Sequence, residues 1–149
     1  MKTLILLISF CVSCILCAQD QPKPEETIIA FFNAFHQQDT VALRNLVHPR
    51  VRMQSIAKSK TGVPTLTTSN FNDFLKSIAS IPETTVFQER ILDYKVTSDG
   101  VMANVWTPYE FYVDYKRSHC GVNNFQLLFI EKQWKIFYIV DTRKTEDCN

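Results

Sequence analysis

The stretch GVNNFQLLFIEKQWKIFYIVDT, residues 121–142, decides the fold. It holds two apolar runs, Gly121–Ile130 and Trp134–Thr142, on either side of the polar tripeptide Glu131-Lys132-Gln133. Apolar runs of this length, separated by a few turn residues, predict two antiparallel strands. Hydrophobic side chains occupy both alternate positions of each run, so both faces of the sheet need a cover.

The residues before this pair continue the same pattern. Thr85–Thr97 and Val101–Val113 predict two more strands, and Ser98-Asp99-Gly100 between them is a hairpin signal. Asp114–Ser118 is expected to be a polar turn. The second half of the chain is therefore predicted to be an antiparallel meander of four long strands.

The first half is predicted to be mainly helical. Helices are expected over 24–38, 40–47 and 70–79, with Asp39 capping the second and Thr68 or Ser69 capping the third. A short strand is expected over 51–55, and the polar stretch 57–68 is expected to be a loop. Helices followed by an antiparallel sheet define an α+β domain.

Two apolar sheet faces have a consequence for assembly. Three helices can cover one face, and the other face then requires a second layer or a partner subunit. The sequence therefore favours a homodimer.

The first 18 residues are predicted to be a signal peptide. Lys2 is followed by an apolar run, Leu4–Cys17, that is short for a membrane span, and cleavage is expected after Ala18. Residues 19–23 would be a linker and 24–149 the folded domain of a secreted or periplasmic protein. The alternatives are a retained anchor and a lipoprotein with lipid on Cys14 or Cys17.

Cleavage would leave two cysteines, Cys120 and Cys148. In an oxidising compartment two thiols favour one disulfide, and two free thiols are the alternative. Closing the chain between them would contribute about 3–4 kcal/mol by the chain-entropy model.

Composition excludes several classes of function. The 149 residues carry 16 Lys and Arg against 15 Asp and Glu, so no basic surplus favours a nucleic-acid partner. Only three glycines are present, and no glycine-rich nucleotide motif or G-x-S-x-G motif is found. The three histidines lack metal-ligand spacing, so no metal site and no cofactor are predicted.

The order of elements resembles the nuclear transport factor 2-like superfamily, which includes ketosteroid isomerase and scytalone dehydratase. The resemblance covers about residues 24–143 and is carried by four segments: Ile28–Phe35, Asp39–Pro49, Asp99–Val105 and Phe125–Ile136. The Leu-x-x-x-x-His-Pro pattern ending at Pro49 is most similar to the branch named for lumazine binding.

This resemblance implies a cone-shaped, curved antiparallel sheet wrapped around three N-terminal helices. It also implies a pocket inside the cone and, often, a dimer through the outer sheet face. Enzymes of the family place Asp, Glu, His or Tyr in the cone as acids and bases. The fold also serves binding proteins and adaptors.

Three residues are candidates for such chemistry: Glu110, His119 and His36. Glu110 is surrounded by aromatic residues, which would raise its pKa, although a rim position is the alternative. His119 could meet Glu110 or Asp141 across neighbouring strands, or could make an ordinary cross-strand contact. His36 follows the aromatic stripe of the first helix, and its alternative is a solvent-facing position.

A second group of residues is predicted to bind a ligand through aromatic surface and neutral polar groups. This group consists of Trp106, Glu110, Tyr112, Asn124, Gln126 and Phe35.

The sequence thus predicts an exported domain that binds a small, partly apolar molecule in a conical pocket. The first alternative is an isomerase or dehydratase that transfers protons with a pocket carboxylate and histidine. The second is a protein-interaction module that uses the outer sheet face. The interior of the cone distinguishes the three. A cavity with a converging carboxylate and histidine favours the enzyme, an aromatic-lined cavity without such a pair favours the binding protein, and a cone packed solid favours the interaction module.

Overall fold

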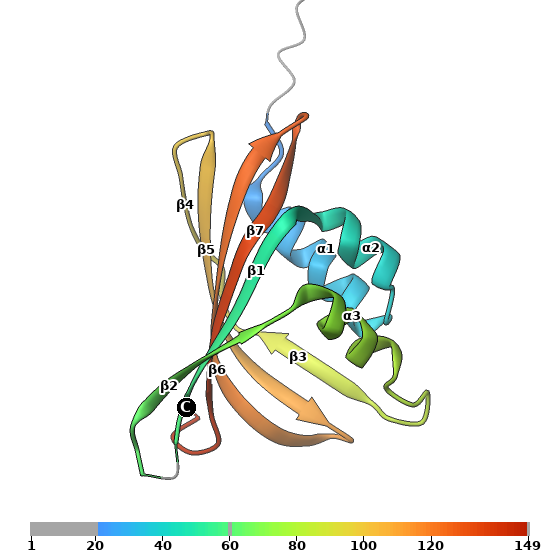
Figure 1. Ribbon diagram of the computed structural model, residues 1–149, viewed down its shortest axis with the longest axis vertical. Helices are drawn as coiled ribbons and strands as arrows, with labels where there is room; N and C mark the ends of the chain where they lie inside the picture. The colour runs from blue at the N-terminus through green and yellow to red at the C-terminus, as the bar shows by residue number, and fades with distance from the viewer. Residues whose placement is uncertain (1–20, 60, 149) are drawn as a thin grey trace, which may run out of the picture.

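The computed structural model describes residues 21–59 and 61–148. Within them, three helices pack on one side of a curved seven-stranded sheet (Figure 1). The helices are α1 (Pro24–His36), α2 (Thr40–Leu46) and α3 (Phe71–Ala79). The strands are β1 (Val47–Lys58), β2 (Pro64–Ser69), β3 (Phe87–Ile91), β4 (Lys95–Ser98), β5 (Met102–Val113), β6 (Lys116–Ile130) and β7 (Gln133–Lys144). The predicted α+β class is confirmed.

Local signals explain where the helices begin. Proline opens α1, and Glu25 and Glu26 lie in its first turn, where the helix dipole favours negative charge. The Asp39 carboxylate accepts hydrogen bonds from the backbone of Val41 and Ala42, which confirms the predicted cap of α2. The cap of α3 is Asn70, one residue beyond the predicted Ser69.

The sheet order is β2-β1-β7-β6-β5-β3, and β4 also pairs with β5. The prediction of a wholly antiparallel sheet is wrong at one place, because β1 and β7 run parallel. The first strand and the last strand of the chain therefore lie side by side. This pairing brings Met53 beside Ile139 and Ser55 beside Asp141.

Two predicted segments differ from the structure. The stretch expected to be a loop contains β2, which pairs with the longer β1 as a hairpin. All six residues of β2 are exposed, so it has no apolar alternation to mark it as a strand. The predicted strand Thr85–Thr97 is two strands, β3 and β4, which pair with successive parts of β5.

The core lies between the helices and the inner face of the sheet. Phe31 and Phe32 of α1 contact the ring of Phe125 on β6 edge-on, with centroids 5.7 and 5.8 Å apart. Leu127 and Ile136 are fully buried in the same layer. No helix among the described residues covers the outer face, where Trp106 is 41% exposed. No described helix combines the length and apolarity needed to cross a membrane.

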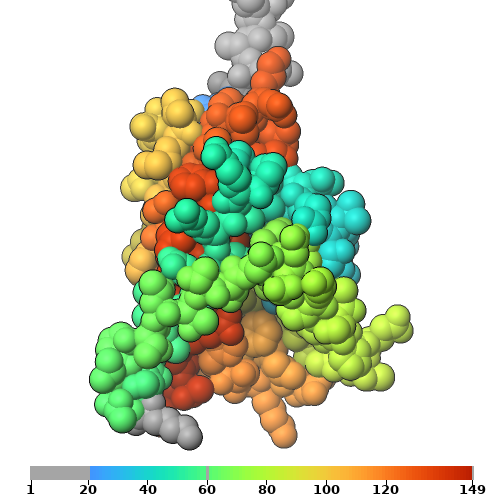
Figure 2. Space-filling model, viewed as in Figure 1, coloured from blue at the N-terminus to red at the C-terminus, as the bar shows by residue number. Residues whose placement is uncertain are grey.

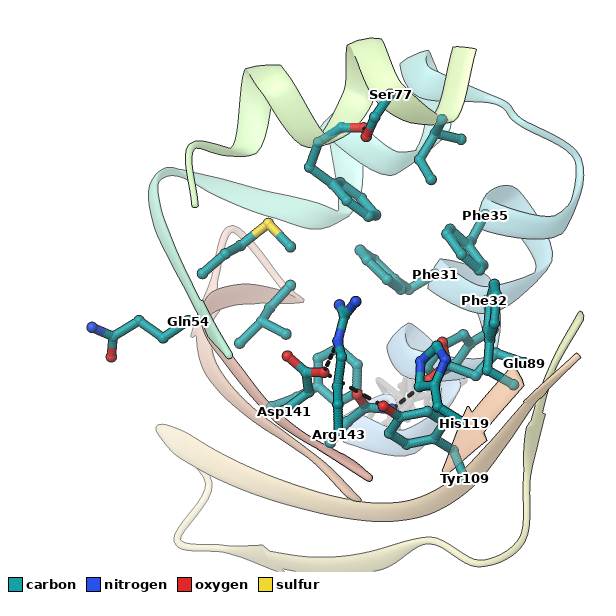
Figure 3. Close-up of a pocket in the computed structure, with 17 residues that line it drawn as sticks. Phe31, Phe32, Phe35, Gln54, Ser77, Glu89, Tyr109, His119, Asp141 and Arg143 are labelled. Atoms are coloured by element: carbon teal, nitrogen blue, oxygen red, sulfur yellow. Dashed lines mark hydrogen bonds and ion pairs between the residues drawn. The ribbon is translucent and has the colours of Figure 1, made fainter. Parts of the chain in front are cut away.

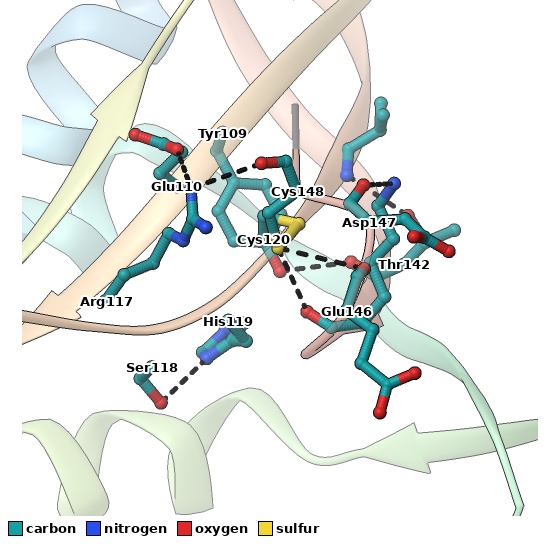
Figure 4. Close-up of a disulfide and its surroundings, with 12 residues drawn as sticks. Tyr109, Glu110, Arg117, Ser118, His119, Cys120, Thr142, Glu146, Asp147 and Cys148 are labelled. Atoms are coloured by element: carbon teal, nitrogen blue, oxygen red, sulfur yellow. Dashed lines mark hydrogen bonds and ion pairs between the residues drawn. A yellow bond between two sulfur atoms is a disulfide. The ribbon is translucent and has the colours of Figure 1, made fainter.

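The predicted disulfide between Cys120 and Cys148 is present (Figure 4). It holds the end of the chain against the outer side of β6. Arg117 adds a second tie, since its guanidinium donates to the Cys148 carbonyl oxygen at 3.2 Å and to Glu110 at 2.6 Å. The predicted signal peptide and the candidate lipid sites Cys14 and Cys17 lie outside the described residues.

Candidate functional site

A cavity of about 280 Å³ lies between the helices and the inner face of the sheet (Figure 3). A single water requires about 10–15 Å³, and cavities for small molecules span about 300–1,000 Å³. At about 280 Å³ the cavity lies just below the range for drug-sized ligands, which suits a smaller molecule of one or two rings. The predicted cone is not filled by its own phenylalanines.

One part of the cavity is apolar. Phenylalanines reach it from α1, α3 and two strands, because each of these elements directs its apolar face inward. Phe35 and Phe74 stack with centroids 6.1 Å apart, and Phe31 lies similarly against Phe74. The apolar lining consists of Phe31, Phe32, Phe35, Met53, Phe74, Ile78, Phe111, Phe125 and Ile139.

The other part is polar and is built on β3, β5, β6 and β7. It consists of Glu89, Tyr109, His119, Asn123, Asp141 and Arg143, with Gln54 and Ser77 at the rim. Figure 3 shows the strand residues below the cavity and Phe31, Phe35 and Ser77 above it. A ligand would thus meet apolar rings on one side and hydrogen-bonding groups on the other.

Glu89 is held at two atoms, one carboxyl oxygen and the backbone nitrogen. The Asn123 amide, on a residue only 6% exposed, donates to Glu89 Oε1 at 2.7 Å. The backbone N–H of Glu89 donates to His36 Nε2 at 2.9 Å, which ties β3 to the end of α1. Its second carboxyl oxygen remains available to a ligand.

Burial raises the pKa of Glu89 to about 7, and the nearby negative charge of Asp141 adds to the rise. The hydrogen bond from Asn123 and the positive charge of Arg143 act in the opposite direction but do not cancel it. Glu89 can therefore gain or lose a proton near neutral pH, as a general acid or base must.

Asp141 and Arg143 form an ion pair beside Glu89. Arg143 Nε donates to Asp141 Oδ2 at 2.6 Å, and the guanidinium extends into the cavity (Figure 3). Tyr109 donates to the Thr142 carbonyl oxygen at 3.0 Å. Burial and the negative charge of Asp141 raise the pKa of Tyr109 well above its usual value, so it stays neutral.

His119 lines the cavity between two aromatic rings. Its ring stacks on Phe111 with centroids 4.9 Å apart and meets Tyr109 edge-on at 5.8 Å. Burial lowers the pKa of His119, and the positive charge of Arg143 lowers it further, so the imidazole is neutral near pH 7. His119 and Asp141 line the same cavity, but no hydrogen bond joins them among the described residues.

His36, the last residue of α1, lies against β3 and is not among the residues that line the cavity. Its Nε2 accepts the backbone N–H of Glu89, and burial lowers its pKa. His36 therefore positions the strand that carries Glu89.

Glu110 lies on the outer face of the sheet. Arg117 donates to its Oε1 at 2.6 Å and Tyr112 donates to its Oε2 at 2.9 Å, and both bonds lower its pKa. Arg90 lies over the Tyr112 ring at 4.2 Å. The structure therefore does not bring Glu110 together with His119, and the raised pKa expected for Glu110 is wrong.

The predicted ligand-binding group divides in the same way. Phe35 lines the cavity. Trp106 and Tyr112 share the outer face with Glu110, and Asn124 and Gln126 lie on the outer face of β6. The prediction assigned the wrong set of alternate residues to the inner face. Asn123 and Phe125 point inward, so Asn124 and Gln126 point outward.

Sequence reasoning missed Glu89 as a site residue. A signal was present, because Glu89 alternates with Phe87 and Ile91 and therefore shares their face of β3. A carboxylate between two inward apolar residues is the pattern expected for a charged group inside a cavity. Asn123 and Arg143 carry the same kind of signal on β6 and β7.

Comparison with known proteins places the fold. No model of a known protein family matches the sequence, and no curated protein matches it. Solved structures do match. An NTF2-like protein from Cytophaga hutchinsonii is 12% identical, with a TM-score of 0.64 over 80% of this chain and 94% of that chain.

Two further structures are similar. An NTF2-like protein of unknown function from Shewanella baltica is 13% identical, with a TM-score of 0.59 over 82% of this chain and 91% of that chain. A protein from Streptomyces avermitilis, provisionally named a dehydratase of the NTF2-like family, is 16% identical, with a TM-score of 0.60 over 80% and 92%. None of the three distinguishes the lumazine-binding branch. The chain therefore has the fold of the nuclear transport factor 2-like superfamily.

Proposed function

We propose that the protein binds a small, partly apolar molecule in the cavity. The observation that carries this proposal is the division of the lining into a phenylalanine-rich part and a part with converging polar groups. Apolar surface contributes affinity, whereas a few fixed polar groups orient the ligand. Glu89 and Asn123 are already joined by a hydrogen bond, so little ordering is needed when a ligand binds.

The proposal is tested with 2-naphthol, which has two fused apolar rings and one hydroxyl group. Titration followed by naphthol fluorescence should show saturable binding. Ser77→Trp should weaken it at least about tenfold, because Ser77 lies at the rim and an indole there would fill part of the cavity.

Glu110→Gln is the matched control, since Glu110 lies on the opposite face of the sheet. It should leave the affinity for 2-naphthol unchanged, contrary to the ligand-binding role that the sequence predicted for Glu110. Absence of binding to the unmodified protein, or equal binding to the Ser77→Trp variant, would contradict the proposal.

A second candidate function is proton transfer on a cyclic substrate, by an isomerase or a dehydratase. The specific observation in its favour is a carboxyl group with a pKa of about 7 in the same cavity as a neutral histidine, His119. This function requires that the protein catalyse exchange of the α-hydrogens of a cyclic ketone with solvent. A protein that only binds its ligand does not need to catalyse this exchange.

We also propose that the protein is exported, to the periplasm or the cell exterior. The charged and apolar pattern of the first 18 residues supports this proposal, and the Cys120–Cys148 disulfide is compatible with an oxidising compartment. The N-terminal residue of the purified protein tests it. An N-terminus at Gln19 supports cleavage after Ala18, and a lipidated cysteine at the N-terminus would contradict that cleavage site.

We further propose that the protein forms a homodimer through the outer face of the sheet. Met102, Trp106 and Ile130 are 52%, 41% and 40% exposed on strands β5 and β6. Trp106→Glu replaces a large exposed apolar side chain of this face with a charge, so we expect it to weaken self-association at least about a hundredfold. Sedimentation equilibrium should show dimers of the unmodified protein and monomers of the variant.

Val41→Glu is the control for that experiment. Val41 is an exposed apolar residue of α2, on the helical side of the molecule, and the change adds the same charge. It should leave the dimer intact. A monomeric unmodified protein, or equal dissociation by both variants, would contradict the proposed interface.

A further inference from the structure

A second hollow adjoins the cavity, between the β1–β2 hairpin and α3. We call it the vestibule, and its volume is about 520 Å³. Figure 2 shows the molecule hollowed between the green hairpin and the yellow-green segment that contains α3. Six residues line both hollows: Met53, Gln54, Phe74, Ser77, Asp141 and Arg143. The two hollows are therefore neighbouring parts of one site.

The vestibule differs from the cavity in its chemistry. The residues that line it alone are Ser55, Thr68, Ser69, Asn70 and Asp73, and none of them is apolar. The Gln54 side chain, which pairs with Thr68, points away from the cavity (Figure 3). Ser55 and Ser69 lie on the same face as Met53, because Ser55 alternates with Met53 on β1 and Ser69 is the partner of Met53 on β2. Hydroxyl groups that can both donate and accept thus face the vestibule.

The charges in the vestibule are paired. Lys76 contacts Asp73 at 3.1 Å, and Arg143 contacts Asp141 at 2.6 Å. An anionic group placed there would meet two carboxylates, and a cationic group would meet the Arg143 guanidinium where the hollows join. An uncharged group with several hydroxyls meets no such repulsion and can match the donors and acceptors.

From this arrangement we infer that the ligand is an apolar ring system joined to an uncharged, polyhydroxylated group such as a sugar. The ring occupies the phenylalanine-rich cavity and the hydroxylated group occupies the vestibule. This inference rests on the proposed function, because it assigns the second half of the same ligand.

Binding of 2-naphthol and 2-naphthyl β-glucoside, each measured by calorimetry, tests the inference. One or two additional hydrogen bonds should make the glucoside bind about tenfold more tightly than naphthol. The double variant Ser55→Ala/Ser69→Ala should remove most of this gain and leave naphthol binding unchanged. Thr67→Ala, on the same strand as Ser69 but outside the vestibule lining, should retain the gain.

The outcomes separate the two proposals. Naphthol binding without any gain from the glucose group overturns the assignment of the vestibule and leaves the proposed function standing. Tighter binding of 2-naphthyl phosphate than of the glucoside overturns the uncharged character assigned to the group. Failure of naphthol and of both conjugates to bind overturns the inference and the proposed function together.

Discussion

Gly121→Ala should lower the free energy of unfolding by about 3 kcal/mol, at the upper end of the cost of overpacking. A Cβ atom at this position would lie 1.8 Å from the Thr142 carbonyl oxygen and 3.1 Å from Tyr109 Cε1. The first contact is with backbone, which cannot rotate away, so β6 and β7 must separate. The same Thr142 oxygen accepts the Tyr109 hydroxyl, and that hydrogen bond would be disturbed as well.

The measurement is thermal or urea unfolding of the two proteins under the same conditions. A loss of about 3 kcal/mol should lower Tm by on the order of 10 °C in a domain of this size. Gly62→Ala is the control: Gly62 has a φ of +80° but nothing within 4 Å of the added carbon, so about 1 kcal/mol is expected. Equal losses in the two variants would contradict the steric argument.

The fold was predictable because its elements have strong local patterns. The alternation in residues 121–142 and the Asp39 cap each indicate one structure. The parallel pairing of β1 with β7 has no such signal, since it joins segments about ninety residues apart whose partner is chosen by packing. Strand β2 is exposed and rich in threonine and serine, so its edge position could not be read from hydrophobicity.

The site was predictable in kind but not in its residues. A carboxylate among aromatic residues was expected, and the structure has one, but at Glu89 instead of Glu110. Both faces of β5 carry aromatic residues, so the sequence alone does not show which face meets the helices. A change of one position in that choice moves Trp106, Glu110 and Tyr112 from the cavity to the outer face.

Glu89→Gln should make the protein more stable above neutral pH, by about 3 kcal/mol at a pH of about 8. The pKa of Glu89 is about 7 in the folded protein and 4.5 in the absence of the fold. The neutral carboxyl therefore contributes fully to stability below 4.5, and this contribution is lost as the pH rises through 7. Glutamine does not ionise and can still accept the Asn123 hydrogen bond, so it avoids the loss.

The two proteins should have nearly equal stability at a pH of about 4, and their Tm values should diverge by on the order of 10 °C at a pH of about 8. The difference between them isolates Glu89, because every other ionisable group is present in both proteins. Glu110→Gln, on the outer face, should show no such divergence. A constant Tm difference across the pH range would mean that Glu89 does not titrate near neutrality.

A pH-dependent divergence would show that the fold retains a carboxyl group where an amide is more stable. Proteins tolerate such a cost where the group acts on a ligand.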